Sequence, residues 1–155
     1  MNTNDYLINK YGSGSPKIVP GMIRHNLYQL FAELGFTVGC EVGVEKGKNA
    51  QEMFECIPNL KLYAVDPFKE HPNSYSYAKS VSARHWNDSF MQVCKGQTQK
   101  RMQGRNAVII EKFSEEAVQD IPYDSLDFVY IDGDHSYDYV MTDIILWTRR
   151  VRSGG

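Results

Sequence analysis

The first apolar run of strand character in the chain ends in a turn with two glycines and two acidic residues. The turn reads EVGVEKG over residues 41–47. Glycine lets the backbone approach a ligand that a Cβ would exclude, so Gly43 and Gly47 are candidate ligand contacts, although both are also typical of an ordinary tight turn. The carboxylates of Glu41 and Glu45 suit a cationic ligand and would repel a pyrophosphate. A nicotinamide dinucleotide is therefore disfavoured.

Acidic residues and a histidine follow two further apolar runs. Asp66 comes nineteen residues after Gly47, about the distance at which an acidic side chain bonds ribose hydroxyls in dinucleotide folds, although an aspartate before proline is also typical of a turn. Asp132 and His135 follow the most strand-like run, 126–131. A carboxylate can bind a cation, and a histidine can either accept a hydroxyl proton or donate to a neighbouring carboxylate.

The stretches between these groups alternate between strand and helix patterns. Apolar side chains recur with helical spacing over 23–34, 50–57 and 140–151, and more weakly over 88–103, whereas 37–44, 60–65, 107–111 and 126–131 are short apolar runs. Ser114 is expected to cap a short helix. The alternation predicts an α/β, Rossmann-like parallel sheet with helices on both faces. In such sheets ligands bind outside the carboxyl ends of the strands, where the candidate residues lie.

Composition favours one soluble, cytoplasmic domain that acts on small molecules. The chain has 155 residues, 42% of them hydrophobic, and a formal net charge of -2. No basic run indicates nucleic-acid binding, and no apolar run approaches the ~20 residues that span a membrane. The three cysteines form no C-x-x-C pair, so neither a disulfide framework nor a zinc site is indicated. Residues 1–19 are expected to form a flexible lead-in to a domain over 20–155.

Three motifs occur in an order that identifies a family resemblance. The turn at 41–47, the Asp66-Pro67 pair and YIDGDHSY at 130–137 together resemble the class I S-adenosylmethionine-dependent methyltransferases. More narrowly, they are similar to the branch with the I-D-G-D-H-S-Y signature, which includes cephalosporin and macrolide-sugar O-methyltransferases. The resemblance covers residues 20–155 and implies O-methylation of a small molecule or sugar. S-adenosylmethionine carries two cations and no phosphate, which agrees with the acidic turn.

The resemblance also implies roles for individual residues. The implied cofactor-binding residues are Glu41, Gly43, Gly47, Asp66, Phe113, Ser114 and Asp132. In this arrangement the two glycines lie beneath the cofactor, Glu41 faces its aminoacyl end and Asp66 bonds the ribose. Phe113 would stack on adenine, and Ser114 would reach the edge of the ring.

Asp132 and His135 are the implied catalytic residues. Asp132 matches the position that binds a divalent metal in metal-dependent members of the group, and His135 matches a proposed general base. A Mg²⁺ ion would lower the pKa of the acceptor hydroxyl while the histidine accepts its proton. The other metal ligands of related enzymes come from a fifth strand that this sequence lacks, so a complete metal site cannot be drawn.

The family pattern continues beyond the Gly-Gly turn at which this sequence ends. The usual seven-stranded sheet is therefore expected to lack its C-terminal strands, and the unpaired edge of the strand at 128–131 predicts a homodimer or poor solubility. Two alternatives stay open: a methyltransferase-like module that binds without turnover, and a metal-dependent phosphoesterase suggested by residues 133–135. The candidate acceptor contacts in the loop after the second strand are His71, Tyr75, Tyr77 and His85.

Overall fold

The computed structural model describes residues 2–14, 19–70 and 87–155. The candidate acceptor contacts His71, Tyr75, Tyr77 and His85 lie outside the described residues. In chain order, the helices and strands are α1 (Thr3–Tyr11), α2 (Arg24–Glu33), β1 (Val38–Val42), α3 (Lys48–Cys56), β2 (Lys61–Val65), α4 (Asp88–Met102), β3 (Ala107–Ile110), α5 (Ser114–Ala117), β4 (Phe128–Ile131) and α6 (Tyr137–Trp147), with 3₁₀ turns at Val118–Asp120 and Thr148–Arg150.

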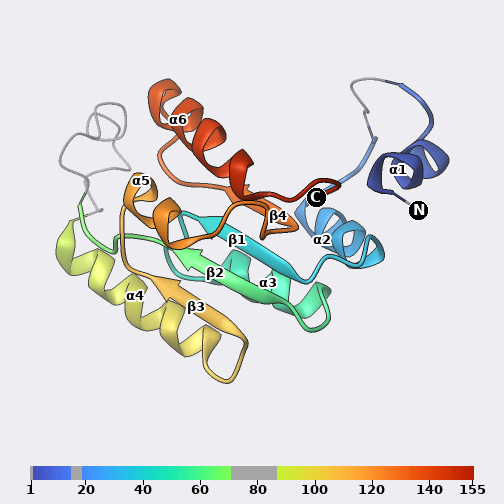
Figure 1. Ribbon diagram of the computed structural model, residues 1–155. Coiled ribbons are helices and arrows are strands. Elements are labelled where there is room, and N and C mark those ends of the chain that lie inside the picture. The colour runs from blue at the N-terminus through green and yellow to red at the C-terminus, as the bar shows by residue number, and fades with distance from the viewer. Residues whose placement is uncertain (1, 15–18, 71–86) are drawn as a thin grey trace.

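The four strands form one parallel sheet with the order β3-β2-β1-β4 (Figure 1). Helices α2, α3 and α4 cover one face, and α5 and α6 cover the other. The predicted α/β, Rossmann-like class is therefore confirmed. No helix in the described ranges is long and apolar enough to cross a membrane.

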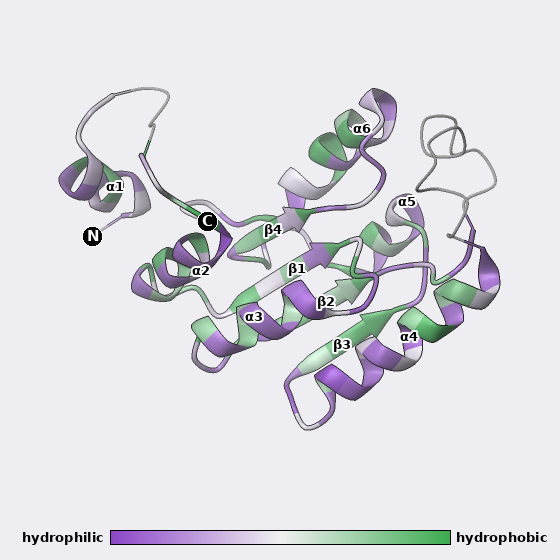
Figure 2. Cartoon of the chain, turned by 180° about the vertical axis from the view of Figure 1, so that it is seen from behind, coloured by the Kyte–Doolittle hydropathy of each residue, from purple (hydrophilic) through white to green (hydrophobic). Residues whose placement is uncertain are grey.

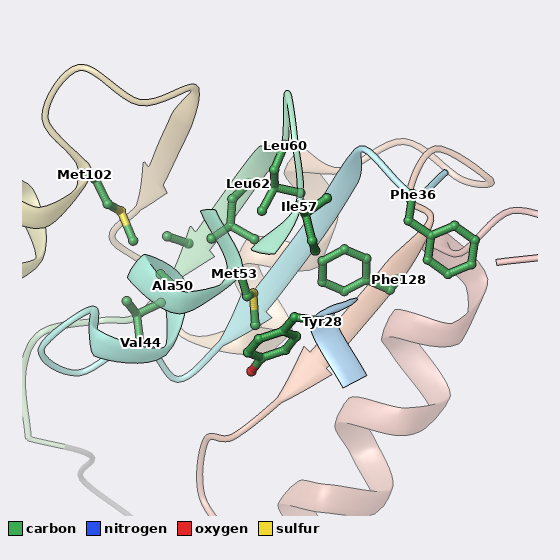
Figure 3. Packing of buried hydrophobic residues seen from close by; sticks show 11 residues of the cluster. Tyr28, Phe36, Val44, Ala50, Met53, Ile57, Leu60, Leu62, Met102 and Phe128 are labelled. Carbon is green, nitrogen blue, oxygen red and sulfur yellow. The ribbon is translucent and has the colours of Figure 1, made fainter. Parts of the chain in front are cut away.

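The first face of the sheet is packed with aromatic and aliphatic side chains (Figure 3). Tyr28 of α2 and Met53 of α3 are completely buried against it, and Phe128 of β4 is 5% exposed. The Phe128 ring leaves no room for a side chain on the neighbouring strand, because a Cβ on Gly39 would lie 2.5 Å from its Cε1 atom. The core thus fixes β1 directly beside β4, and this pairing brings the ends of both strands together.

Helix α1 lies in the segment that was expected to be a flexible lead-in. None of its nine residues is buried, so the helix packs no apolar stripe into the core. The helix is stabilised by polar contacts instead: the side chain of Asn2 accepts the amide of Asp5 at 2.8 Å, and the Tyr6 hydroxyl donates to Glu33 of α2 at 2.7 Å. The helix was not predicted because polar contacts hold it in place, and hydrophobic periodicity does not detect such contacts.

Strand β4 lies at one edge of the sheet. Just before it, Leu126 pairs with Val151 in an isolated parallel bridge, and the amide of Arg152 donates to the carbonyl of Leu126 at 2.9 Å. Within the described part of the chain, no strand pairs with the outer edge of β4 itself. Self-association through this edge stays a prediction.

Asp127 holds the amino end of β4 to the start of β1. Its Oδ2 accepts the backbone amides of Thr37 and Val38 at 2.6 and 2.8 Å. Its Oδ1 accepts Nε of Arg152 at 2.6 Å. Burial by itself would raise the pKa of Asp127, but these bonds outweigh it and hold the pKa below its ordinary value.

Replacing Asp127 by asparagine should lower the free energy of unfolding by about 2–3 kcal/mol near neutral pH, because an amide group would face backbone donors and lose the charge. The folded pKa lies below the unfolded value of about 3.9, so the stabilisation is present above that pH and is lost as the pH falls through the folded pKa. Urea unfolding at neutral pH and near pH 3 measures both effects. Asp120→Asn, which removes only an exposed pair with Lys112, should cost at most about 0.5 kcal/mol. Equal losses in the two variants would contradict the assignment.

Candidate functional site

The ends of the four strands lie level at one edge of the sheet. The register pairs Val42 with both Val65 and Ile131, and it pairs Val65 with Ile110. Backbone bonds continue past the strands, from the amide of Gly43 to Val65 at 2.9 Å and from the amide of Asp132 to Val42 at 2.8 Å. The structure therefore brings the predicted residues at 41–47, 66 and 132 together, at the arrowheads in Figure 1.

Both predicted glycines of the β1–α3 turn have left-handed backbone conformations. Gly43 has φ 91° and Gly47 has φ 71°. A Cβ on Gly43 would lie 2.6 Å from backbone atoms of Asp132 and Gly133, and one on Gly47 would lie 3.2 Å from Thr98 of α4. These neighbours explain why glycine is needed at both positions. A location beneath a cofactor stays a prediction.

Asp66 organises the turn from the end of β2. It is 5% exposed, and its Oδ2 accepts the amides of Val44 and Glu45 at 3.0 and 2.8 Å. Its Oδ1 accepts the amide of Phe68 at 2.8 Å. Burial raises the pKa of Asp66, while these three amides act in the opposite direction. A carboxylate has about four lone-pair sites, so one is left for a ligand hydroxyl. Asp66 is thus a positioning residue in addition to its predicted ribose contact.

Glu41 is a buried carboxylate near the end of β1, where Figure 2 shows hydrophilic colour within the strand. It is 1% exposed, and its Oε1 accepts the side-chain amide of Asn49 at 2.7 Å. The Tyr28 hydroxyl in turn donates to Asn49. Among the described residues, Oε2 has no hydrogen-bond partner. Burial raises the pKa of Glu41 to about 8, and the nearby carboxylate of Asp132 acts in the same direction.

Asp132 lies at the end of β4 between two basic groups. Its Oδ1 is 3.7 Å from Nε2 of His135, and its Oδ2 is 3.9 Å from Nη2 of Arg24. Its side chain is 33% exposed and that of His135 is 57% exposed, so both are accessible to a ligand. The predicted catalytic pair therefore lies together, with the carboxylate beside the imidazole. Such a carboxylate stabilises the imidazolium that forms when histidine takes up a proton.

Sequence reasoning missed Arg24 and Asn49. Arg24 is the first residue of α2, and its guanidinium carbon lies 5.6 Å from the centre of the Tyr130 ring. Asn49 is 8% exposed and shares a helix face with Met53 and Ile57 at spacings of four. A polar residue on an apolar helix face is a detectable signal, because a buried amide requires a partner. Arg24 gave no such signal, since its position depends on how α2 packs.

Phe113 and Ser114 lie where the chain leaves β3. The prediction that Ser114 caps the helix is wrong: Phe113 occupies the N-cap position and Ser114 is the first residue of α5. The Ser114 hydroxyl donates to the buried carboxylate of Asp143 and accepts Nε1 of Trp147 at 2.7 Å, so it joins α5 to α6. Its predicted contact with adenine stays a prediction. The ammonium group of Lys69 lies over the Phe113 ring, 4.6 Å from its centre.

The residues described at this edge do not form a metal site. Over the described ranges, no group of three or more His, Cys, Asp or Glu side chains is placed to hold a metal. Asp132 instead has Arg24 at 3.9 Å, and a guanidinium competes with a cation for the carboxylate. The predicted Mg²⁺ ion is therefore not supported. The buried Oε2 of Glu41 suits an ammonium group.

Comparisons with known proteins identify a family and similar folds. A family model described as a methyltransferase domain matches residues 40–155. The fold is similar to that of precorrin-6y C5,15-methyltransferase from Geobacter metallireducens, with 17% identity, a TM-score of 0.55, and coverage of 93% of this chain and 64% of that one. It is also similar to spermidine synthase from Thermotoga maritima, with 10% identity, a TM-score of 0.54, and coverage of 83% and 40%. The chain thus spans less than two thirds of either structure. No curated protein matches it.

Proposed function

The chain belongs to the methyltransferase-domain family whose model matches residues 40–155, and from this we propose that it uses S-adenosylmethionine to methylate a hydroxyl of a small molecule or sugar. The observation that carries the proposal is the buried Glu41 carboxylate. It lies where the aligned strands end, close enough to Asp132 for the two carboxylates to interact. An acidic site of this kind attracts a sulfonium and an ammonium and repels phosphate. The resemblance of IDGDHSY at 131–137 to the signature of an O-methyltransferase branch supports oxygen as the methylated atom.

The side chains at the strand ends divide the work of binding and proton transfer. Glu41 binds the ammonium of the cofactor, Asp66 accepts a ribose hydroxyl and Phe113 stacks on adenine. The cofactor supplies an electrophilic methyl group on its sulfonium. His135 accepts the proton of the acceptor hydroxyl, and the Asp132 carboxylate 3.7 Å away stabilises the imidazolium. Alignment of the two reactants supplies most of the remaining rate enhancement.

The proposal includes a cytoplasmic location. Cys40, Cys56 and Cys94 are free thiols, which is typical of a reducing compartment.

Calorimetric titration with S-adenosylhomocysteine tests the cofactor site without knowledge of the acceptor. The chain should bind this product, and Phe113→Ala should weaken binding about 10-fold through loss of stacking on adenine. Val93→Ala, which alters an exposed side chain of α4, should bind as the parent does. If the parent chain and both variants bound S-adenosylhomocysteine with equal affinity, Phe113 would not contact the cofactor.

The same titration, combined with assays of methyl transfer and phosphate-ester hydrolysis, separates the alternative functions. Binding without methyl transfer to any hydroxyl acceptor would favour a non-catalytic module. Failure to bind, together with metal-dependent hydrolysis of a phosphate ester, would favour the phosphoesterase. A folded chain that binds S-adenosylhomocysteine and transfers methyl groups to a hydroxyl would establish the proposed activity.

A further inference from the structure

Helix α2 carries a cation to the carboxyl end of β4. The Arg24 side chain is 48% exposed. Its guanidinium carbon lies 5.6 Å from the centre of the Tyr130 ring, and its Nη2 is 3.9 Å from Oδ2 of Asp132. That separation is at the outer limit of an ion pair and is longer than a hydrogen bond. A guanidinium has five N–H donors, so Arg24 has donors left for a second anion.

The face of α2 that presents Arg24 also reaches Glu41. Tyr28, one helical turn after Arg24, is completely buried, and its hydroxyl donates to Asn49, which donates to Oε1 of Glu41. This chain fixes the rotation of α2 about its axis. Figure 3 shows the Tyr28 ring near Met53 in the packed cluster. The guanidinium is close enough to act on the Glu41 carboxylate, whose pKa it lowers against the larger effect of burial.

The two charges match the two ends of an amino-acid zwitterion. Within the described ranges, Oε2 of Glu41 has no hydrogen-bond partner, so it can accept an ammonium. The guanidinium of Arg24, 3.9 Å from the same Asp132 that acts on Glu41, can bind a carboxylate with two parallel N–H bonds. A ligand with both groups on one carbon would place its ammonium against Glu41, where it favours the ionised carboxylate despite burial, and its carboxylate against Arg24.

We propose that Arg24 binds the α-carboxylate of the methionine moiety of the cofactor. This assignment rests on the proposed function. It makes Arg24 a specificity-determining residue that selects ligands with an intact amino acid, whereas Phe113 and Asp66 recognise the nucleoside. Nothing in the cofactor-binding motifs of the sequence includes Arg24, because α2 precedes them.

Calorimetry with two ligands tests the assignment. The ligands are S-adenosylhomocysteine and its decarboxylated analogue, which keeps the ammonium and lacks only the carboxylate. The parent chain should prefer S-adenosylhomocysteine by about 10- to 100-fold, as expected for a charge-assisted pair. In Arg24→Ala this preference should vanish while affinity for the analogue stays within about 3-fold of the parent. Arg24→Lys should keep part of the preference.

Arg105→Ala is the matched control, because Arg105 also lies over an aromatic ring, Phe54, at 5.2 Å, but precedes β3 at the opposite edge of the sheet. It should leave both affinities unchanged. A preference retained in full by Arg24→Ala would overturn the inference. Equal weakening of both ligands would overturn it too. If the folded parent chain binds neither ligand, the proposed function fails and the inference fails with it.

Discussion

A Gly43→Ala chain should lose about 3 kcal/mol or more of stability together with its affinity for S-adenosylhomocysteine. The backbone at residue 43 has φ 91°, where an L side chain is strained. The added Cβ would also lie 2.6 Å from the carbonyl carbon of Asp132 and from Cα of Gly133. Both are backbone atoms, so a change of rotamer cannot relieve the clash. The loop after β4 must move, and the 2.8 Å bond from the Asp132 amide to Val42 would lengthen or break.

Gly104→Ala separates the strain from the clash. Gly104 also has a positive φ, 75°, but no described atom lies within 4 Å of its Cβ position. The control should therefore cost only the strain of a left-handed residue, about 1 kcal/mol, and should leave ligand binding intact. Urea unfolding and calorimetry of both variants give the two quantities. If Gly43→Ala were no less stable than Gly104→Ala, the loop after β4 would have freedom to move, and close packing would not explain the glycine.

The fold could be predicted because its elements have distinct hydrophobic periods. The apolar runs at 60–65 and 107–111 correspond closely to Lys61–Val65 and Ala107–Ile110 in the structure. Helix α2 lies where it was predicted but buries Tyr28, while Ile23 of the predicted stripe is 64% exposed. Periodicity gives the presence of a helix more reliably than the rotation about its axis. That rotation decides that Arg24 faces the site.

The location of the site followed from topology, but its internal bonding did not. Parallel strands bring their carboxyl ends to one edge, so Glu41, Asp66 and Asp132 had to lie near one another. Residue types do not reveal which partners a polar group has. The carboxylate of Asp66 accepts three backbone amides of the turn region. The Ser114 hydroxyl forms hydrogen bonds with Asp143 and Trp147. Side-chain partners depend on tertiary packing that sequence spacing does not encode.

Replacing Glu41 by glutamine should reduce affinity for S-adenosylhomocysteine about 100-fold or more. The same substitution should stabilise the ligand-free chain at alkaline pH. Glutamine keeps an oxygen for the 2.7 Å bond from Asn49 but removes the charge that would bind an ammonium. The charge is also what burial disfavours. Loss of function and gain of stability are therefore expected from one substitution, which is typical of a binding site that holds a desolvated charge.

The pH dependence of stability tests the second half of this expectation. Burial raises the pKa of Glu41 from 4.5 to about 8, so the stabilisation that its protonated form gives is full below pH 4.5 and is lost as the pH rises through about 8. Glutamine cannot ionise, so Glu41→Gln should exceed the parent by an amount on the order of a few kcal/mol near pH 9 and differ little near pH 5. Chemical unfolding of ligand-free chains at both pH values measures the difference.

A matched substitution on α3 decides whether the effect belongs to Glu41 or to any lost carboxylate. Glu55 lies on the exposed side of the same helix that carries Asn49, and it accepts Nε2 of Gln51 at 2.9 Å. Glu55→Gln should change neither the affinity nor the pH profile, because an exposed carboxylate is already hydrated. If Glu41→Gln bound S-adenosylhomocysteine as tightly as Glu55→Gln does, the buried carboxylate would be structural and the ammonium would have another partner. If it lost affinity without gaining stability near pH 9, Glu41 would already be paired in the free chain, and the desolvated charge would not explain the site.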